Sequence, residues 1–264
     1  MHICRFTQMI DSSAPCFGVV TDEGLVLPFS EGETLSSLIE KDFAPPNDVE
    51  AMALNKVRLV APIIPSKIVC VGRNYRDHAA EFGNPMPDEP LLFLKPPSAI
   101  IGHDDMITLP PMSARVEHEG ELGVVIGRRA RCISEHADSL AYVLGYTCVN
   151  DVTARDLQRR DVQFTRAKSF DTFCPVGPLI VTGLLPAALH VQTRVNGITR
   201  QRAQTSAMAF PVEYLIRYIS HVMTLEVGDL IATGTPAGVG PLVAGDSVEV
   251  EVEGVGILRN SVNA

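Results

Sequence analysis

Short strand-like runs, interrupted by frequent glycine and proline, constrain the fold of this 264-residue chain more than any other feature. Helical periodicity is convincing in only two segments, 153–164 and 212–223. Because strands and helices do not alternate regularly, a doubly wound parallel sheet is disfavoured. We predict an α+β, β-rich fold around a mixed or antiparallel sheet. The predicted strands beyond residue 65 are 91–95, 119–126, 141–150, 179–182, 190–195, 230–233 and 247–252.

The first sixty residues have the pattern of a small separate unit. The stretch CFGVVTDEGLVLPF alternates and turns at Asp22-Glu23-Gly24, which predicts a β-hairpin, and the short amphipathic piece TLSSLIEKDF follows it. Pro62 and Pro65 then form a stiff connector before the β-like run KIVCVG. We therefore predict a small N-terminal domain over 1–65 and a larger domain over 66–264.

Charge and cysteine usage limit the partners and the compartment. The formal net charge is −9, so binding to phosphate backbones is disfavoured and no nucleic-acid partner is expected. Six scattered cysteines with no C-x-x-C pair, behind an N-terminus without a signal-peptide pattern, favour free thiols in the cytoplasm. The long uncharged stretch from residue 172 contains several prolines and glycines, so no membrane helix is expected.

The segment RVEHEGELGVVIG, residues 115–127, carries the sharpest chemical signal. On a strand, Glu117, Glu119 and Glu121 share one face, with successive acids roughly 7 Å apart at Cα. Carboxylates beside a buried run are costly unless a cation lies between them, and all-oxygen ligands favour a hard divalent ion. The alternative is a solvated strand face. The local pattern does not decide which two of the three acids bind.

Asp151 is a candidate for a further ligand from elsewhere in the chain. It ends the apolar run YVLGYTCVND just before the predicted helix 153–164. The alternative role is the N-cap of that helix, which is a common place for aspartate.

Two other features could supply acid–base chemistry. His78 and Glu81, in VGRNYRDHAAEFG, are three residues apart and are neighbours if the segment is helical. A carboxylate beside an imidazole creates a general base, although an exposed surface pair would look the same. Lys168 enters the largely apolar stretch FTRAKSFDTFCPVGP, where it could stabilise an enolate or carboxylate or could simply be a surface lysine.

Taken in order, these segments resemble the fumarylacetoacetate hydrolase family. The resemblance covers about 66–264 and is carried by the blocks KIVCVGRNYRDHAAE, LFLKPPSAIIG, EHEGELGVVIG, GYTCVNDVTARDLQ, RAKSFDTFCPVGP, VNGITRQ and GDLIATGTPAGVGP. It implies a β-roll-like fold on mixed sheets, a homodimer and one Mg²⁺ or Mn²⁺ ion in each active site.

The resemblance also implies roles for individual residues. Glu119, Glu121 and Asp151 become the metal ligands, and Glu117 drops out. His78 and Glu81 match a dyad on a mobile segment that closes over the substrate, and Lys168 matches the active-site lysine. The positions expected to contact substrate are Arg73, Arg155, Gln158 and Thr235.

The activity expected from this resemblance is enolate chemistry on a 2-oxo acid. Hydrolytic C–C cleavage of acylpyruvates, decarboxylation of oxaloacetate-like acids and isomerisation of 2-hydroxyhepta-2,4-diene-1,7-dioate or 5-carboxymethyl-2-hydroxymuconate, as in aromatic catabolism, share this intermediate. The dyad favours C–C cleavage, because a water-activating base is superfluous for decarboxylation. An alternative of another class is a non-catalytic, metal-stabilised module that binds a dicarboxylate.

Overall fold

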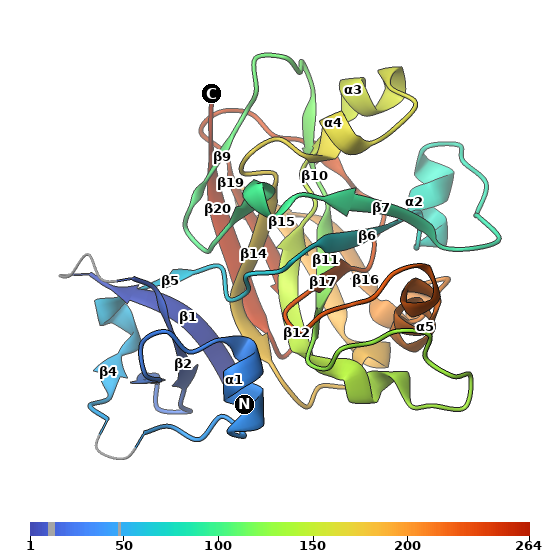
Figure 1. Ribbon diagram of the computed structural model, residues 1–264. Helices are drawn as coiled ribbons and strands as arrows, with labels where there is room; N and C mark the ends of the chain where they lie inside the picture. The colour runs from blue at the N-terminus through green and yellow to red at the C-terminus, as the bar shows by residue number, and fades with distance from the viewer. Residues whose placement is uncertain (10–13, 47–48) are drawn as a thin grey trace.

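The fold is built mainly from strands, as Figure 1 shows. The structure is a computed structural model that describes residues 1–9, 14–46 and 49–264. Its strands form three sheets, and parallel and antiparallel pairs occur in the same sheet. The prediction of a β-rich fold with mixed sheets is therefore confirmed.

The largest sheet carries most of the chain. Its strands are β1 (His2–Gln8), β2 (Cys16–Val20), β3 (Leu25–Pro28), β4 (Met52–Ala53), β5 (Val57–Val60), β6 (Ile68–Gly72), β7 (Leu91–Lys95), β8 (Ile100–Ile101), β11 (Gly120–Ile126), β12 (Val143–Asn150), β14 (Cys174–Val181) and β17 (Leu230–Ala232). They lie in the order β4-β3-β2-β1-β14-β12-β11-β17-β6-β7, with β5 beside β1 and β8 beside β14. The central strands β11 and β12 are buried along most of their length because the sheet is covered on both faces.

Two smaller sheets and a few helices complete the described part of the chain. One sheet has the order β16-β15-β19-β20-β9 and the other β13-β10-β18. Their strands are β9 (Met106–Thr108), β10 (Val116–His118), β13 (Thr153–Ala154), β15 (His190–Val195), β16 (Ile198–Gln204), β18 (Gly240–Pro241), β19 (Ser247–Val252) and β20 (Gly256–Asn263). The α-helices are α1 (Leu35–Glu40), α2 (Arg76–Glu81), α3 (Arg155–Arg160), α4 (Thr165–Lys168) and α5 (Val212–Val222).

The main core lies between the largest sheet and the five-stranded sheet. Leu122 and Val124 of β11 pack in one cluster with Val250 and Val252 of β19. The run SVEVEV of β19 alternates buried valines with half-buried polar residues, as expected of a strand with one face on a core. The apolar face of α5 joins this cluster through Leu215 and its neighbours. No helix in the described ranges combines the length and apolar character that crossing a bilayer requires.

The N-terminal strands extend the largest sheet. The predicted hairpin is confirmed as the antiparallel pair β2 and β3. Strand β1 pairs with β14, so that His2 lies opposite Val181 and Ile3 opposite Ile180. The β1–β14 pairing therefore joins the two predicted units by hydrogen bonds. A domain division at residue 65 stays a prediction.

The structure corrects the predicted helix 153–164. Residues 153–154 form β13, which pairs with β10, and only Arg155–Arg160 form α3. The pairing of Thr153 with Glu117 outweighs local helix propensity. The N-cap position of α3 is Ala154, so the N-cap role considered for Asp151 is wrong.

Several predicted strands have different ends from those observed. The run at 119–126 forms β11 only from Gly120 onward. Glu119 lies between two strands, because β10 before it belongs to one sheet and β11 after it to another. The run at 141–150 begins with a 3₁₀ turn over Ser139–Tyr142, and the run at 179–182 belongs to the longer strand β14. Strands 91–95, 190–195 and 247–252 match β7, β15 and β19.

Candidate active site

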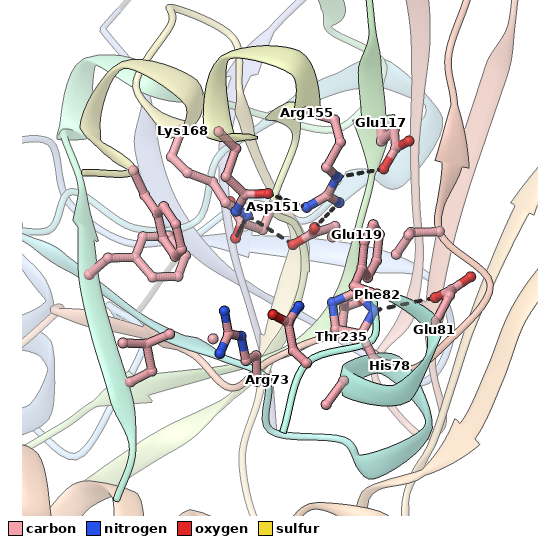
Figure 2. Close-up of a pocket in the computed structure, with 18 of the residues that line it drawn as sticks. Arg73, His78, Glu81, Phe82, Glu117, Glu119, Asp151, Arg155, Lys168 and Thr235 are labelled. Atoms are coloured by element: carbon pink, nitrogen blue, oxygen red, sulfur yellow. Dashed lines mark hydrogen bonds and ion pairs between the residues drawn. The ribbon is translucent and has the colours of Figure 1, made fainter. Parts of the chain in front are cut away.

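One cavity gathers all of the residues predicted to carry chemistry. It has a volume of about 700 Å³ and is walled by α2, by α3 and α4, by the ends of β10 and β11, and by the loop after β17 (Figure 2). Arg73, His78, Glu81, Glu119, Glu121, Asp151, Arg155, Gln158, Lys168 and Thr235 all line it. Segments far apart in the sequence therefore meet in one place.

Three acids form a compact cluster in this cavity. Glu119, Glu121 and Asp151 each offer a carboxylate oxygen, and these oxygens lie within 4.8 Å of one another. The antiparallel pairing of β11 with β12 places Gly120 opposite Asn150, so the acids at the strand ends become neighbours. The Asp151 N–H donates to the Glu119 carbonyl oxygen at 2.8 Å, which fixes this junction. The sequence alone could not choose among these acids, because the choice depends on the strand register.

Glu117 lies in the same cavity but has a different environment. Its carboxylate accepts hydrogen bonds from Arg115 Nε at 2.5 Å and from Arg155 Nε at 2.6 Å. Glu117 is not part of the compact cluster. Two arginines satisfy its charge, which explains how this acid can be buried.

Two buried lysines contact the acidic cluster. Lys168 Nζ donates to Glu119 Oε2 at 2.9 Å and to Asp151 Oδ2 at 2.5 Å. The alternative of a surface lysine is therefore wrong. Lys95, at the end of β7, donates to Asp151 Oδ1 at 2.6 Å. We assigned no role to Lys95 from the sequence, and the available signal was a single charge at the end of the apolar run LLFLK.

Nearby cations stabilise the ionised forms of the three acids to different extents. Burial alone would raise the pKa of Glu119, but Lys168 and Arg155 hold it well below its ordinary value. Burial also opposes the charge of Lys168, yet Asp151 and Glu119 raise its pKa. The pKa of Glu121 is raised well above its ordinary value by burial and then by the negative charges of Asp151 and Glu119. Glu121 is thus the acid whose ionised form most lacks a cation.

This donor set fits a divalent metal ion. Glu121 accepts a hydrogen bond from the Gly234 N–H at 2.8 Å, and it makes no ion pair with any described side chain. Three carboxylates without nitrogen or sulfur ligands are typical of sites for Mg²⁺, Mn²⁺ or Ca²⁺ rather than zinc. A cation between them would stabilise the charged form of Glu121.

His78 and Glu81 occupy the opposite wall of the cavity, on α2. Nδ1 of His78 lies 3.5 Å from Glu81 Oε2, so the predicted pair is present. His78 is only 8% exposed whereas Glu81 is exposed, so the alternative of a surface residue is wrong for the imidazole alone. Burial lowers its pKa below the ordinary value, and the positive charge of Arg155 contributes. A neutral imidazole facing the cavity can accept a proton.

Among the predicted substrate contacts, Arg155 and Gln158 are committed to other partners. Arg155 binds Glu117 and Glu119 through Nε and Nη2, and its Nη1 donates to Gln158 Oε1 at 2.5 Å. These bonds orient the guanidinium toward the acids. A direct substrate contact by either residue stays a prediction.

Arg73 and Thr235 differ in whether their polar groups already have partners in the protein. Arg73, which has the unusual φ of 56°, follows β6 and makes no ion pair with any described residue. Its charge is therefore available to an anion in the cavity. The Thr235 hydroxyl donates to the Gly120 carbonyl at 2.9 Å and accepts from Gln201 Nε2 at 2.7 Å. Their contacts with substrate stay predictions.

Gln201, on β16, is a second residue that sequence reasoning missed. Its side chain is 1% exposed and its oxygen accepts from the Gly120 N–H at 3.0 Å. Its amide nitrogen donates to Thr235 and to the Pro236 carbonyl, both at 2.7 Å. Gln201 therefore joins the strand that carries Glu121 to the loop that carries Thr235. The block VNGITRQ contained it, but nothing in that block distinguishes a buried glutamine from an exposed one.

Comparison with known proteins points to one family. A family model described as fumarylacetoacetate (FAA) hydrolase, C-terminal, matches residues 67–263. The oxaloacetate tautomerase YisK of Bacillus subtilis is 45% identical over 225 residues, which cover 80% of this chain and 74% of the relative.

Solved structures agree with this match. A 5-carboxymethyl-2-hydroxymuconate delta-isomerase from Mycobacterium smegmatis superposes with a TM-score of 0.87 at 41% identity, covering 100% of this chain and 99% of the other. A fumarylacetoacetate hydrolase from Exiguobacterium antarcticum superposes with a TM-score of 0.88 at 38% identity, with the same coverage.

Proposed function

Because the chain belongs to the fumarylacetoacetate hydrolase family, we propose that it is a divalent-metal-dependent enzyme that interconverts the keto and enol forms of a 2-oxo dicarboxylic acid. In the keto-to-enol direction, C3 of a substrate such as oxaloacetate would lose a proton and the 2-oxo oxygen would gain one, becoming the enol hydroxyl. The reverse reaction would return the proton to C3. The relatives named above include a tautomerase and an isomerase, whose reactions both move a proton.

The observation that carries this proposal is the pairing of a buried acidic cluster with a buried histidine in one cavity. Glu119, Glu121 and Asp151 would hold the cation, and we propose Mg²⁺ or Mn²⁺. When bound, the ion would supply Lewis-acid polarisation of the 2-oxo group. His78, on the opposite wall, would exchange the proton.

The side chains around the cavity suggest how the substrate would be oriented. Lys168 uses two N–H groups on Glu119 and Asp151, which leaves one donor for a substrate oxygen that gains negative charge. Arg73 would pair with a substrate carboxylate, because its charge is not taken by a described acid. Glu81 Oε2 makes no hydrogen bond with Nδ1, but its negative charge 3.5 Å away would favour a proton on that nitrogen. Nε2 of His78 would then be the base.

Hydrolytic C–C cleavage of an acylpyruvate is the second candidate. It is the activity that the sequence favoured, and the observation in its support is the His78–Glu81 pair, which could activate water. Cleavage and tautomerisation share the same enolate, so they differ in whether water attacks the distal carbonyl.

A substrate comparison tests both candidates. Oxaloacetate enol and acetylpyruvate would be followed by ultraviolet absorbance with Mg²⁺, for the wild type and for His78→Ala and Glu119→Ala. We expect faster decay of the oxaloacetate enol without loss of carbon, and a large decrease of this rate in both variants. Release of acetate and pyruvate from acetylpyruvate would instead favour hydrolysis. Binding of 2-oxo acids with no conversion of either substrate would favour the non-catalytic module.

We also propose that the protein acts as a homodimer, as the resemblance implies. Light scattering coupled to size exclusion would test this, since the monomer mass is 28.5 kDa. A mass near that of one chain at micromolar concentration would contradict it.

A further inference from the structure

We propose that Phe82 is a positioning residue that fixes His78 over the cavity by packing against Arg155. This inference takes His78 as the proton-transfer group of the proposed function. It concerns how α2 acquires its position, which the roles assigned above do not explain.

Helix α2 has few polar contacts of its own that would hold it. It has six residues, and its N-cap residue Tyr75 makes no side-chain capping bond. Arg73 before it and Gly83 after it both have positive φ, at 56° and 65°. Isolated helices of this length are unstable in water, so its position must come from packing.

The known polar contacts of the dyad are also long. Glu81 accepts from the Gly238 N–H at 3.2 and 3.3 Å, and His78 Nδ1 has no hydrogen-bond partner among the described residues. The carboxylate of Glu81 is therefore shared between the imidazole and the loop after β17. These contacts alone leave the imidazole ring free to rotate about its side-chain bonds.

Tyr75 and Ala79, each 2% exposed, anchor α2 to the interior, and Phe82 adds a contact to the His78 ring itself. Its ring meets the His78 ring edge-on, with centroids 5.2 Å apart and an interplanar angle of 70°. Arg155 Cζ lies over the same ring, 4.8 Å from its centroid. Figure 2 shows the phenyl ring beside His78 near Glu119. Aromatic pairs of this geometry and cations over ring faces are both attractive.

Arg155 provides a rigid surface for this ring. Its guanidinium is held by Glu117 and Glu119 and is bonded to Gln158. Glu119 belongs to the acidic cluster, so one continuous chain of contacts runs from the cluster through Arg155 and Phe82 to His78. These contacts thereby fix the position of His78 relative to the acidic cluster. Loss of the ring should impair proton transfer more than substrate binding.

Two substitutions of Phe82 and one control test this inference. Phe82→Leu keeps apolar volume but removes the ring, whereas Phe82→Tyr keeps the ring. Phe164→Leu removes another ring that lines the cavity, one beside α4 that packs against Phe93 with centroids 5.6 Å apart. Steady-state kinetics with oxaloacetate and hydrogen–deuterium exchange of residues 76–83 would be measured for each, together with thermal melting.

We expect Phe82→Leu to lower kcat about tenfold and to change KM less than about threefold, because a cation–π contact between a buried guanidinium and a half-buried ring has roughly this magnitude. Exchange of residues 76–83 should accelerate several-fold. Phe82→Tyr should keep both kcat and the exchange rate of α2 at their wild-type values. Phe164→Leu should change KM and leave exchange in α2 as in the wild type. The melting temperatures of the two leucine variants should be similar.

Three results would overturn the inference. They are an unchanged exchange rate of α2 in Phe82→Leu, an equally accelerated exchange of α2 in Phe164→Leu, and values in Phe82→Tyr that differ from the wild type as those of Phe82→Leu do. If the wild type converts no 2-oxo acid, the proposed function fails, and the exchange measurement still decides whether Phe82 positions α2.

Discussion

Lys95 Nζ lies 2.6 Å from Asp151 Oδ1, and both side chains are almost completely buried. Lys168 binds the other oxygen of the same carboxylate. Four buried acids, Glu117 with the three of the cluster, therefore face four cations, so that their formal charges cancel. The cations are Lys95, Lys168, Arg115 and Arg155. A divalent ion would bring the formal charge of this group to +2. The interior of an acidic protein would then attract an anionic substrate.

The first prediction concerns Lys95. Lys95→Met leaves the Asp151 carboxylate with one fewer buried partner, so the metal-free protein should lose about 3 kcal/mol of unfolding free energy. Added Mn²⁺ should restore part of this loss, since it binds only the folded state. Urea unfolding with EDTA or with Mn²⁺ measures both effects.

A matched control for Lys95 is Lys41, whose exposed ammonium pairs with Glu33. Lys41→Met should change stability by less than about 1 kcal/mol, with or without the ion. Equal losses in the two variants would contradict the role assigned to Lys95.

The second prediction concerns Glu121 and pH. Its pKa in the folded protein is raised above the ordinary value of 4.5, so its contribution to stability is fully present at low pH and is lost as pH rises through the folded pKa. Above pH 5, the metal-free wild type should lose up to about 1.4 kcal/mol per pH unit relative to Glu121→Gln. Urea unfolding of both proteins in EDTA at pH 5 and pH 8 measures the difference.

Glu121→Gln should also abolish Mn²⁺ binding, and binding to the wild type should release a proton. Calorimetry in two buffers with different ionisation enthalpies detects that proton. Parallel stability curves for the two proteins would contradict an elevated pKa of Glu121.

The third prediction concerns the close approach at Gly120. A Cβ added there would lie 2.0 Å from Thr193 Oγ1 and 3.3 Å from Thr193 Cβ. Gly120→Ala should therefore destabilise the protein by about 1–3 kcal/mol, as over-packing does in cores. Thr193→Ala removes the clashing hydroxyl, so the double variant should regain much of this loss. Additive losses in the two variants would count against the packing described.

The fourth prediction concerns the thiols. Cys132 is exposed, whereas burial raises the pKa of Cys148 and Cys174 to about 12. Cys132 should therefore react first with a disulfide reagent, and Cys132→Ser should remove this fast phase. Unfolded, unreduced protein should show all six thiols, because every cysteine is free. Fewer than six would indicate a disulfide.

The helices and strands predicted from the sequence are correct where the local hydrophobic pattern is strong. Strands 190–195 and 247–252 are correct because each alternates between a buried and a solvated face. Helix 153–164 failed because Thr153 pairs with Glu117, a contact that local propensity does not contain. Strand β16 was missed, since its polar run ITRQRAQ has only one fully buried side chain.

The site was predictable where residues lie close in the sequence. Short spacings identified the Glu117–Glu121 acids and the His78–Glu81 pair, and local context made Asp151 and Lys168 candidates. The family resemblance was needed to assign roles and to set Glu117 aside. Lys95, Gln201 and Phe82 act through contacts between distant segments. No spacing rule reveals such contacts, because they depend on the strand register and on the path of the loops.

The most direct test of the metal site is Mn²⁺ binding, measured by titration calorimetry on the wild type, Asp151→Asn and His78→Ala. Asp151 belongs to the acidic cluster, whereas His78 lies on the opposite wall of the cavity. We expect one ion per chain in the wild type and in His78→Ala, and no measurable binding in Asp151→Asn. Equal Mn²⁺ affinity in all three proteins would contradict the proposed metal site.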